Sequence, residues 1–186
     1  HEISGNGKKP LVLLHGFMEN TTIWDEMEAH LSKDFTLIKI DLPGHGKSKV
    51  YQEIHTVELM AEKVKEVIDA LKLEKINLLG HSLGGYVSLA FAEKFPEILE
   101  SMTLFFSTTV ADDEEKKAIR KRSIAVIDEN FETFVKTSIP NLFSNNEKDI
   151  LEGKIELAKN IAKSTNKEGV KAAQLGMAER PDRTEI

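Results

Sequence analysis

One serine stands where this chain could carry out nucleophilic chemistry. The segment Gly80-His81-Ser82-Leu83-Gly84 has the spacing G-x-S-x-G, which is typical of a sharp strand-to-helix turn that exposes a serine hydroxyl. A side chain at Gly80 or Gly84 would collide in such a turn, because the residues two before and two after the serine come close together. Ser82 is therefore the candidate nucleophile.

A second segment could supply the groups that stabilise a negative charge. His15-Gly16-Phe17 directly follows the apolar run Leu11–Leu14. Glycine lets the backbone approach a ligand closely, so the Phe17 N–H could point at an oxyanion that develops on a substrate. A simple strand-ending turn produces the same pattern, so this segment does not decide the matter by itself.

The residues around both segments predict alternating strands and helices. Apolar runs bounded by turn formers predict strands, and apolar residues at helical spacing predict helices. The strands are expected at 2–4, 11–14, 35–40, 76–79 and 102–106, and the helices at 20–31, 57–71 and 86–95. Strands that alternate with helices of this length favour an α/β fold with a parallel sheet. The Ser82 turn would then join a buried strand to a helix.

Composition excludes several classes of function. The 186 residues carry a net charge of −6 with lysines interleaved among acids, so we expect no nucleic-acid partner. No apolar run is long enough to cross a bilayer, and we expect no membrane partner. The absence of cysteine excludes disulfides and thiol chemistry and is compatible with a cytoplasmic location. We expect a small-molecule substrate, no cofactor and no metal, and the oligomeric state stays open.

Three ordered motifs together resemble the α/β-hydrolase fold superfamily. They are His15-Gly16-Phe17, the loop Asp41-Leu42-Pro43-Gly44-His45-Gly46-Lys47-Ser48, and Gly80-His81-Ser82-Leu83-Gly84-Gly85. The chain is most similar to small bacterial serine hydrolases with a helical cap. This resemblance implies a mostly parallel, doubly wound α/β sheet. It also implies that Ser82 is the nucleophile at a nucleophile elbow, that the backbone N–H groups of Leu83 and Phe17 form the oxyanion hole, and that the Asp41–Ser48 loop is mainly structural.

The implied function is that of a serine hydrolase, an esterase that cleaves a small carboxylic ester or thioester through an acyl-enzyme. A carbon-carbon bond hydrolase or lyase on the same fold is an alternative, and a non-catalytic binding module is another. Dehalogenase relatives use aspartate as nucleophile, so the serine argues against that branch. Around Ser82, we expect Gly16, His15 and His81 to line the substrate pocket.

The chain departs from the family pattern in its histidines. In this fold the triad residues follow in the order Ser, then Asp or Glu, then His, yet all six histidines lie at or before residue 81. The chain is a fragment whose acid and base lie beyond residue 186, or a pseudoenzyme, or an enzyme that has recruited an upstream histidine. We favour the fragment, truncated at the C-terminus and at the N-terminus, and therefore expect the C-terminal strands to be missing and the chain alone to be incomplete for turnover.

The second half of the chain has a different pattern. We expect residues 1–109 to form the N-terminal part of the hydrolase core, 110–178 a helical cap, and 179–186 a link back toward the core. The acids Asp112 to Glu115 indicate a helix start, where Asp112 or Asp113 could instead serve as a displaced triad acid. The following charges, Lys116, Lys117, Arg120 and Lys121, are expected to form a solvated face.

Overall fold

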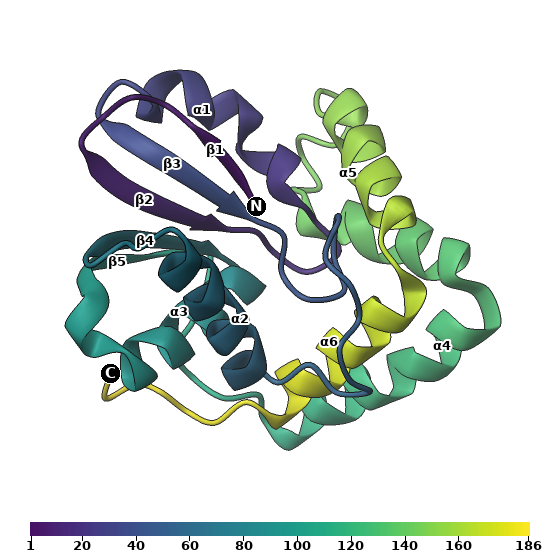
Figure 1. Cartoon of the computed structure of the whole chain (residues 1–186). Coiled ribbons are helices and arrows are strands. Elements are labelled where there is room, and N and C mark those ends of the chain that lie inside the picture. Colours follow the sequence, from purple (N-terminus) through teal and green to yellow (C-terminus); the bar gives the residue numbers. More distant parts are fainter.

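Five strands form one sheet in the order β1-β3-β2-β4-β5, in a computed structural model that describes residues 1–186 (Figure 1). Strand β1 runs antiparallel to β3, and the other neighbours are parallel. The predicted mostly parallel α/β sheet is therefore confirmed. The strands are β1 (Glu2–Ser4), β2 (Lys9–Leu14), β3 (Phe35–Ile40), β4 (Ile76–His81) and β5 (Leu99–Phe105).

Helices cover both faces of the sheet because its central strands are apolar on both sides. Successive strand side chains point to opposite faces. Val12 and Leu14 pack with helices α2 (Val57–Ala70) and α3 (Leu83–Lys94). Leu11 and Leu13 pack instead against Trp24, beside which α1 (Asp25–Leu31) begins. The doubly wound arrangement follows from these two apolar faces.

Two element boundaries differ from the sequence prediction. The helix expected at 20–31 is divided, because Asn20 caps a tight 3₁₀ turn η1 (Thr21–Trp24) before α1 begins. Strand β5 begins at Leu99, directly after the short 3₁₀ helix η2 (Pro96–Ile98), rather than at residue 102. Parallel pairing with β4 extends it, since backbone bonds do not require apolar side chains.

A helical layer lies beyond the carboxyl ends of the parallel strands (Figure 1). It consists of α4 (Glu114–Ser138), η3 (Ile139–Leu142), α5 (Glu152–Ser164) and α6 (Lys167–Glu179). Met18, from the loop after β2, is buried in its apolar cluster together with Ile127, Phe134, Val135, Ile139, Ala162 and Val170. The helical layer is thus packed directly onto the loop that follows a central strand.

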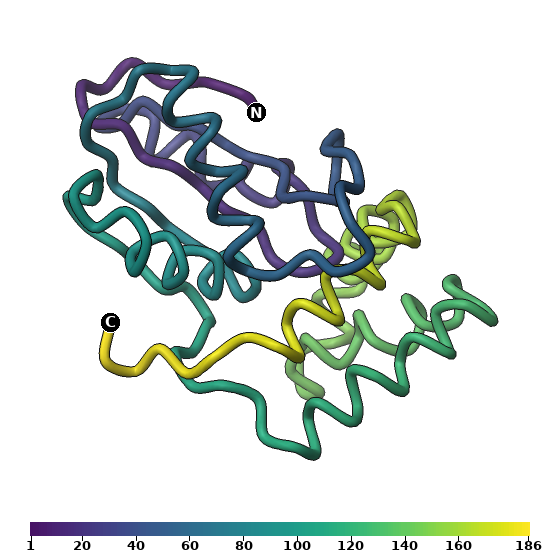
Figure 2. The backbone as a smooth tube through the Cα atoms, turned by 60° about the horizontal axis from the view of Figure 1, so that its bottom comes forward, coloured from purple at the N-terminus to yellow at the C-terminus, as the bar shows by residue number.

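The chain leaves the sheet for the helical layer and returns beside its own exit. Figure 2 shows the segment after α6 running next to the segment after β5, and the Arg183 N–H donates to the Thr109 carbonyl at 2.9 Å. The buried Asp112 carboxylate pairs with Arg180 at 2.9 Å and with Arg120 of α4. Arg180 also lies 3.9 Å from the ring centroid of Tyr86 in α3. These contacts fasten the exit and the return to the sheet.

Arg120 is the exception to the predicted solvated face at the start of α4, where Lys116 and Lys121 are exposed. Arg120 turns inward to Asp112, because that carboxylate is buried and requires a charged partner. Burial alone would raise the pKa of Asp112, but the hydrogen bonds and charges of Arg120 and Arg180 outweigh it and lower the pKa. The exposed Asp113 is the helix cap, since its side chain accepts the Lys116 N–H at 2.8 Å.

We predict that Asp112→Asn destabilises the protein by about 3 kcal/mol, because it leaves two arginines facing a buried neutral group. The matched variant Asp113→Ala removes only an exposed helix cap and should cost about 1 kcal/mol. Urea unfolding monitored by circular dichroism measures both. Equal losses for the two variants would contradict the role assigned to Asp112.

A second prediction concerns Gly176, where α6 touches the loop before α2. A Cβ at Gly176 would overlap the His55 carbonyl, whereas a Cβ at Gly153 in α5 meets nothing within 4 Å. Gly176→Ala should therefore lower the free energy of unfolding by about 2 kcal/mol. Gly153→Ala should raise it by about 0.5–1 kcal/mol through helix propensity. Thermal melts of the two variants test whether close packing outweighs propensity in α6.

Candidate active site

The turn between β4 and α3 holds Ser82 in a strained conformation. Its backbone has φ 49° and ψ −110°, a region that non-glycine residues avoid at a cost of about 1–3 kcal/mol. The Ser82 N–H donates to the Phe105 carbonyl at 3.0 Å, and the Ser107 hydroxyl donates to the Ser82 carbonyl at 2.8 Å. Hydrogen bonds on both sides of the residue therefore maintain the strained turn that the sequence predicts.

The glycines around Ser82 are required by close packing. A Cβ at Gly80 would overlap the carbonyl of Gly84, and a Cβ at Gly84 would overlap the carbonyl of Leu14 in β2. The predicted collision is thus confirmed, and it reaches across to the neighbouring strand. Ser82 itself is partly exposed at this crowded turn.

The register of the sheet brings the loop after β2 beside Ser82. Leu14 of β2 pairs with Gly80 of β4 in parallel register, so Phe17 and Leu83 each lie three residues beyond that pair. No loop carbonyl or side chain accepts a hydrogen bond from either N–H, although Leu83 is fully buried. The Leu83 N–H stands at the first position of α3, where helix N–H groups have no acceptor within the helix. Two N–H donors are therefore available near the Ser82 turn, one at the start of α3 and one in the loop after β2.

His15 has a role different from the predicted pocket-lining one. Its side chain is fully buried, its Nε2 accepts the Leu42 N–H at 2.9 Å, and its Nδ1 donates to the Gly16 carbonyl at 2.8 Å. Both ring nitrogens are occupied, so no substrate can reach them. His15 instead ties the loop after β2 to the loop after β3.

Two further buried histidines hold the loop after β3. His45 and His55 each donate from Nδ1 to the Pro43 carbonyl at 3.1 Å. Asp41 accepts the N–H groups of Thr21 and Lys47, both at 2.9 Å. These contacts agree with the structural role that the family resemblance implies for this loop. No hydrogen bond joins any histidine to the Ser82 side chain.

Burial keeps these three histidines neutral. It lowers the pKa of His15 and of His55, and it lowers the pKa of His45 to about 3. In each case the backbone hydrogen bond opposes the shift without cancelling it. A neutral imidazole can accept a hydrogen bond at one nitrogen while donating at the other, which is how His15 bridges two loops.

His81 and Glu19 form a pair beside the serine. His81 Nδ1 lies 2.9 Å from Glu19 Oε2, and the same oxygen accepts the Gly16 N–H at 2.5 Å. His81 and Gly16 therefore both lie beside the Ser82 turn. Their contact with a substrate stays a prediction. Sequence reasoning missed Glu19, because a single acid in a loop has no pattern that sets it apart.

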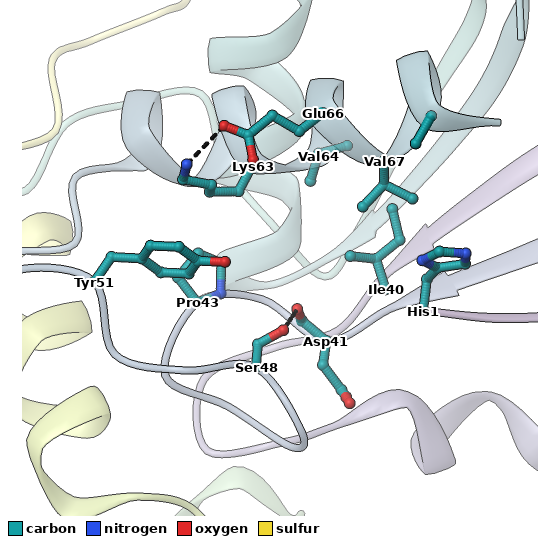
Figure 3. A pocket seen from close by; sticks show the side chains of 11 residues that line it. His1, Ile40, Asp41, Pro43, Ser48, Tyr51, Lys63, Val64, Glu66 and Val67 are labelled. Atoms are coloured by element: carbon teal, nitrogen blue, oxygen red, sulfur yellow. Dashed lines mark hydrogen bonds and ion pairs between the residues drawn. The ribbon is translucent and has the colours of Figure 1, made fainter. Parts of the chain in front are cut away.

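A separate hollow of about 190 Å³ lies between the loop after β3 and helix α2 (Figure 3). Ser82 does not line it. Its charged residues Lys63 and Glu66 pair with each other at 2.6 Å, and its Ser48 hydroxyl bonds to the Asp41 carbonyl. Because these groups are already paired, we place the candidate site at Ser82, where strained backbone and unused donors meet.

No cluster of three or more His, Cys, Asp or Glu side chains has the arrangement to hold a metal ion. None of the helices combines the length and apolar character that crossing a membrane requires.

Comparison with known families agrees with this geometry. A family model described as "alpha/beta hydrolase fold" matches residues 9–149. The chain belongs to this family. The match includes β2, the Ser82 turn and all of α4, so it spans both the sheet and the first part of the helical layer.

Individual relatives are longer than this chain. An uncharacterized protein of Mycobacterium tuberculosis is 34% identical over 111 residues, which are 60% of this chain and 32% of that protein. A serine hydrolase-like protein of Mus musculus is 36% identical over 110 residues, 58% of this chain and 35% of that protein. The chain thus spans about a third of the length of these curated relatives.

The similarity to solved structures extends over nearly the whole chain. A thermophilic esterase from Thermogutta terrifontis is 35% identical with a TM-score of 0.93, over 99% of this chain and 68% of that one. Sheet, Ser82 turn and helical layer are therefore all shared with an esterase structure.

We predict that the buried histidines make the protein sensitive to mild acid. Their folded pKa values lie below the ordinary value of 6.5, so only the unfolded chain takes up these protons as the pH falls. Stability is complete above pH 6.5 and declines below it, by roughly 1.4 kcal/mol per pH unit for each histidine that stays neutral when folded.

Urea unfolding between pH 7.5 and 5 measures this slope. His45→Asn can still donate to the Pro43 carbonyl. It should reduce the slope of stability against pH by roughly 1.4 kcal/mol per pH unit, the contribution of one proton. His30→Asn changes an exposed histidine and should leave the slope unchanged. A slope that is the same in His45→Asn as in the parent protein would contradict the assignment.

Proposed function

We propose that this chain is the serine-bearing part of a hydrolase that cleaves small carboxylic esters or thioesters through an acyl-enzyme. The observation that supports it most strongly is the strained backbone of Ser82, with φ 49°, in a turn that the β2–β4 register sets beside the loop of Phe17. Strain of this kind persists where surrounding structure enforces it, and it is concentrated at active sites.

In the proposed reaction, Ser82 Oγ attacks the carbonyl carbon of the ester while a general base takes its proton. The carbonyl electron pair moves to oxygen and forms a tetrahedral oxyanion, which the N–H groups of Leu83 and Phe17 stabilise. One such donor is worth about 3 kcal/mol in the transition state. Collapse of the intermediate expels the protonated alcohol or thiol, and water then hydrolyses the acyl-enzyme and restores the serine.

We propose that the base comes from outside the residues described here. His15, His45 and His55 are buried with Nδ1 committed to backbone carbonyls, and His81 pairs with Glu19. The first curated relatives are about three times as long as the region they share with this chain, which supports an acid and a histidine beyond residue 186. The carboxylate of Asp112 is already committed to two arginines, which argues against Asp112 as the triad acid.

We propose that the helical layer acts as a cap that shapes the acyl pocket. Met18, one residue after Phe17, is buried in the helical layer's apolar cluster. Movement of α4 to α6 would therefore act on the loop that holds an oxyanion donor. The similarity to the Thermogutta terrifontis esterase extends through this layer and supports ester substrates over a carbon-carbon bond or a purely binding role.

We predict that a fluorophosphonate probe labels the whole protein that contains this sequence and that Ser82→Ala abolishes the labelling. Turnover of 4-nitrophenyl acetate should fall by at least about 10⁴-fold in kcat/KM, because the nucleophile is lost. Ser101→Ala removes an exposed hydroxyl on β5 and should leave both signals unchanged. The proposal fails if Ser82→Ala is labelled as rapidly as the parent protein.

A panel of short-chain and long-chain acyl esters then tests the ester interpretation against the alternatives. Labelling at Ser82 without turnover of any ester would favour a carbon-carbon bond hydrolase or a lyase. A binding module would show neither labelling nor turnover.

A further inference from the structure

A single carboxylate oxygen connects the two loops that meet at Ser82. Glu19 Oε2 accepts the Gly16 N–H at 2.5 Å and lies 2.9 Å from Nδ1 of His81, the residue before Ser82. The side chains of Glu19 and His81 are 23% and 24% exposed. Glu19 is therefore partly buried and joins the loop after β2 to the end of β4. These two segments are far apart in sequence.

The same residue closes the turn that presents Phe17. The Glu19 N–H donates to the Gly16 carbonyl at 3.3 Å, while the Gly16 N–H donates back to the Glu19 carboxylate. Between them Met18 has φ 58°, a strained value for a residue with a side chain. Its burial in the helical layer compensates for that strain. The Gly16 amide is thus used within the turn, and the Phe17 amide is left unused.

We propose that Glu19 is a positioning residue for acyl transfer. It holds the loop of residues 15–19 against the Ser82 turn, so that the N–H groups of Phe17 and Leu83 face one point. This inference depends on the proposed function, because only an oxyanion at Ser82 makes use of that alignment. No hydrogen bond joins His81 to the Ser82 hydroxyl, so the Glu19–His81 pair orients the two loops and does not deprotonate the serine.

The chemistry of the contacts predicts which substitutions matter. A carboxylate accepts hydrogen bonds and cannot donate them, so His81 must carry its proton on Nδ1. Glutamine retains one oxygen that can accept from both Gly16 and His81, whereas alanine removes both bonds. Glu19→Gln should therefore keep the loop in place, and Glu19→Ala should release it.

Steady-state kinetics of the whole protein with 4-nitrophenyl acetate provide the first test. Glu19→Ala should lower kcat by about 10- to 100-fold with KM changed less than 3-fold, because the oxyanion exists in the transition state and not in the bound substrate. Glu19→Gln should stay within about 3-fold of the parent protein. Glu53→Ala, which removes an exposed loop acid, is the matched control and should change neither constant.

A double-variant comparison tests whether Glu19 acts through His81. Glu19→Ala combined with His81→Ala should lose no more activity than the worse single variant, because both remove the same connection. Multiplicative losses, an unchanged kcat in Glu19→Ala, or a loss that appears only in KM would each overturn the inference. So would a Glu19→Gln variant as impaired as Glu19→Ala with a normal thermal melt.

A measurement on the unsubstituted protein keeps the inference testable even if Glu19→Ala does not fold. Nitrogen-15 spectra of the histidine rings should show His81 protonated on Nδ1, and amide exchange should be slower at Gly16 than at Phe17. A His81 ring protonated only on Nε2 would overturn the inference without reference to activity. Labelling that survives Ser82→Ala would contradict the proposed function. An unchanged kcat in Glu19→Ala would contradict only the role of Glu19.

Discussion

The structure around the candidate site depends on the close parallel approach of β2 and β4. Leu14 pairs with Gly80, and the Leu14 carbonyl lies where a side chain on Gly84 would have to be. This packing forces the chain to turn sharply after β4 and places the loop after β2 beside the turn. Because the carboxyl ends of parallel strands meet at one edge of a sheet, the loop after β2 and the start of α3 come together there.

Buried polar side chains stabilise the loops at the carboxyl edge of the sheet. His15 connects the loops after β2 and β3, and Asp41 of the second loop accepts the N–H groups of Thr21 in η1 and of Lys47 in its own loop. Each of these side chains is buried and fully used, as buried polar groups must be. The result is a rigid support in which Ser82 can keep an unfavourable backbone conformation, since local strain persists only where surrounding contacts are numerous.

Three contacts show how the helical layer is attached to this support. Met18 lies in its apolar cluster, Gly176 packs against the His55 carbonyl, and Asp112 joins the exit of the chain to its return through Arg180. The first of these contacts involves the loop that carries a proposed oxyanion donor. Packing of the helical layer and alignment of the donor are therefore physically linked, which gives a reason for the layer to be shared with a solved esterase.

The sequence alone determined the sheet, the Ser82 turn and the family, because these depend on local signals: apolar runs of strand length, and glycines at fixed offsets from one serine. Tertiary structure decided the rest. His15 turns inward to the Leu42 N–H, 27 residues away, and Arg120 donates to Gln174, 54 residues away. Glu19 connects to His81 across 62 residues. Such pairings depend on which loops the strand register brings together. The spacing of residues along the chain does not predict which distant residues will meet.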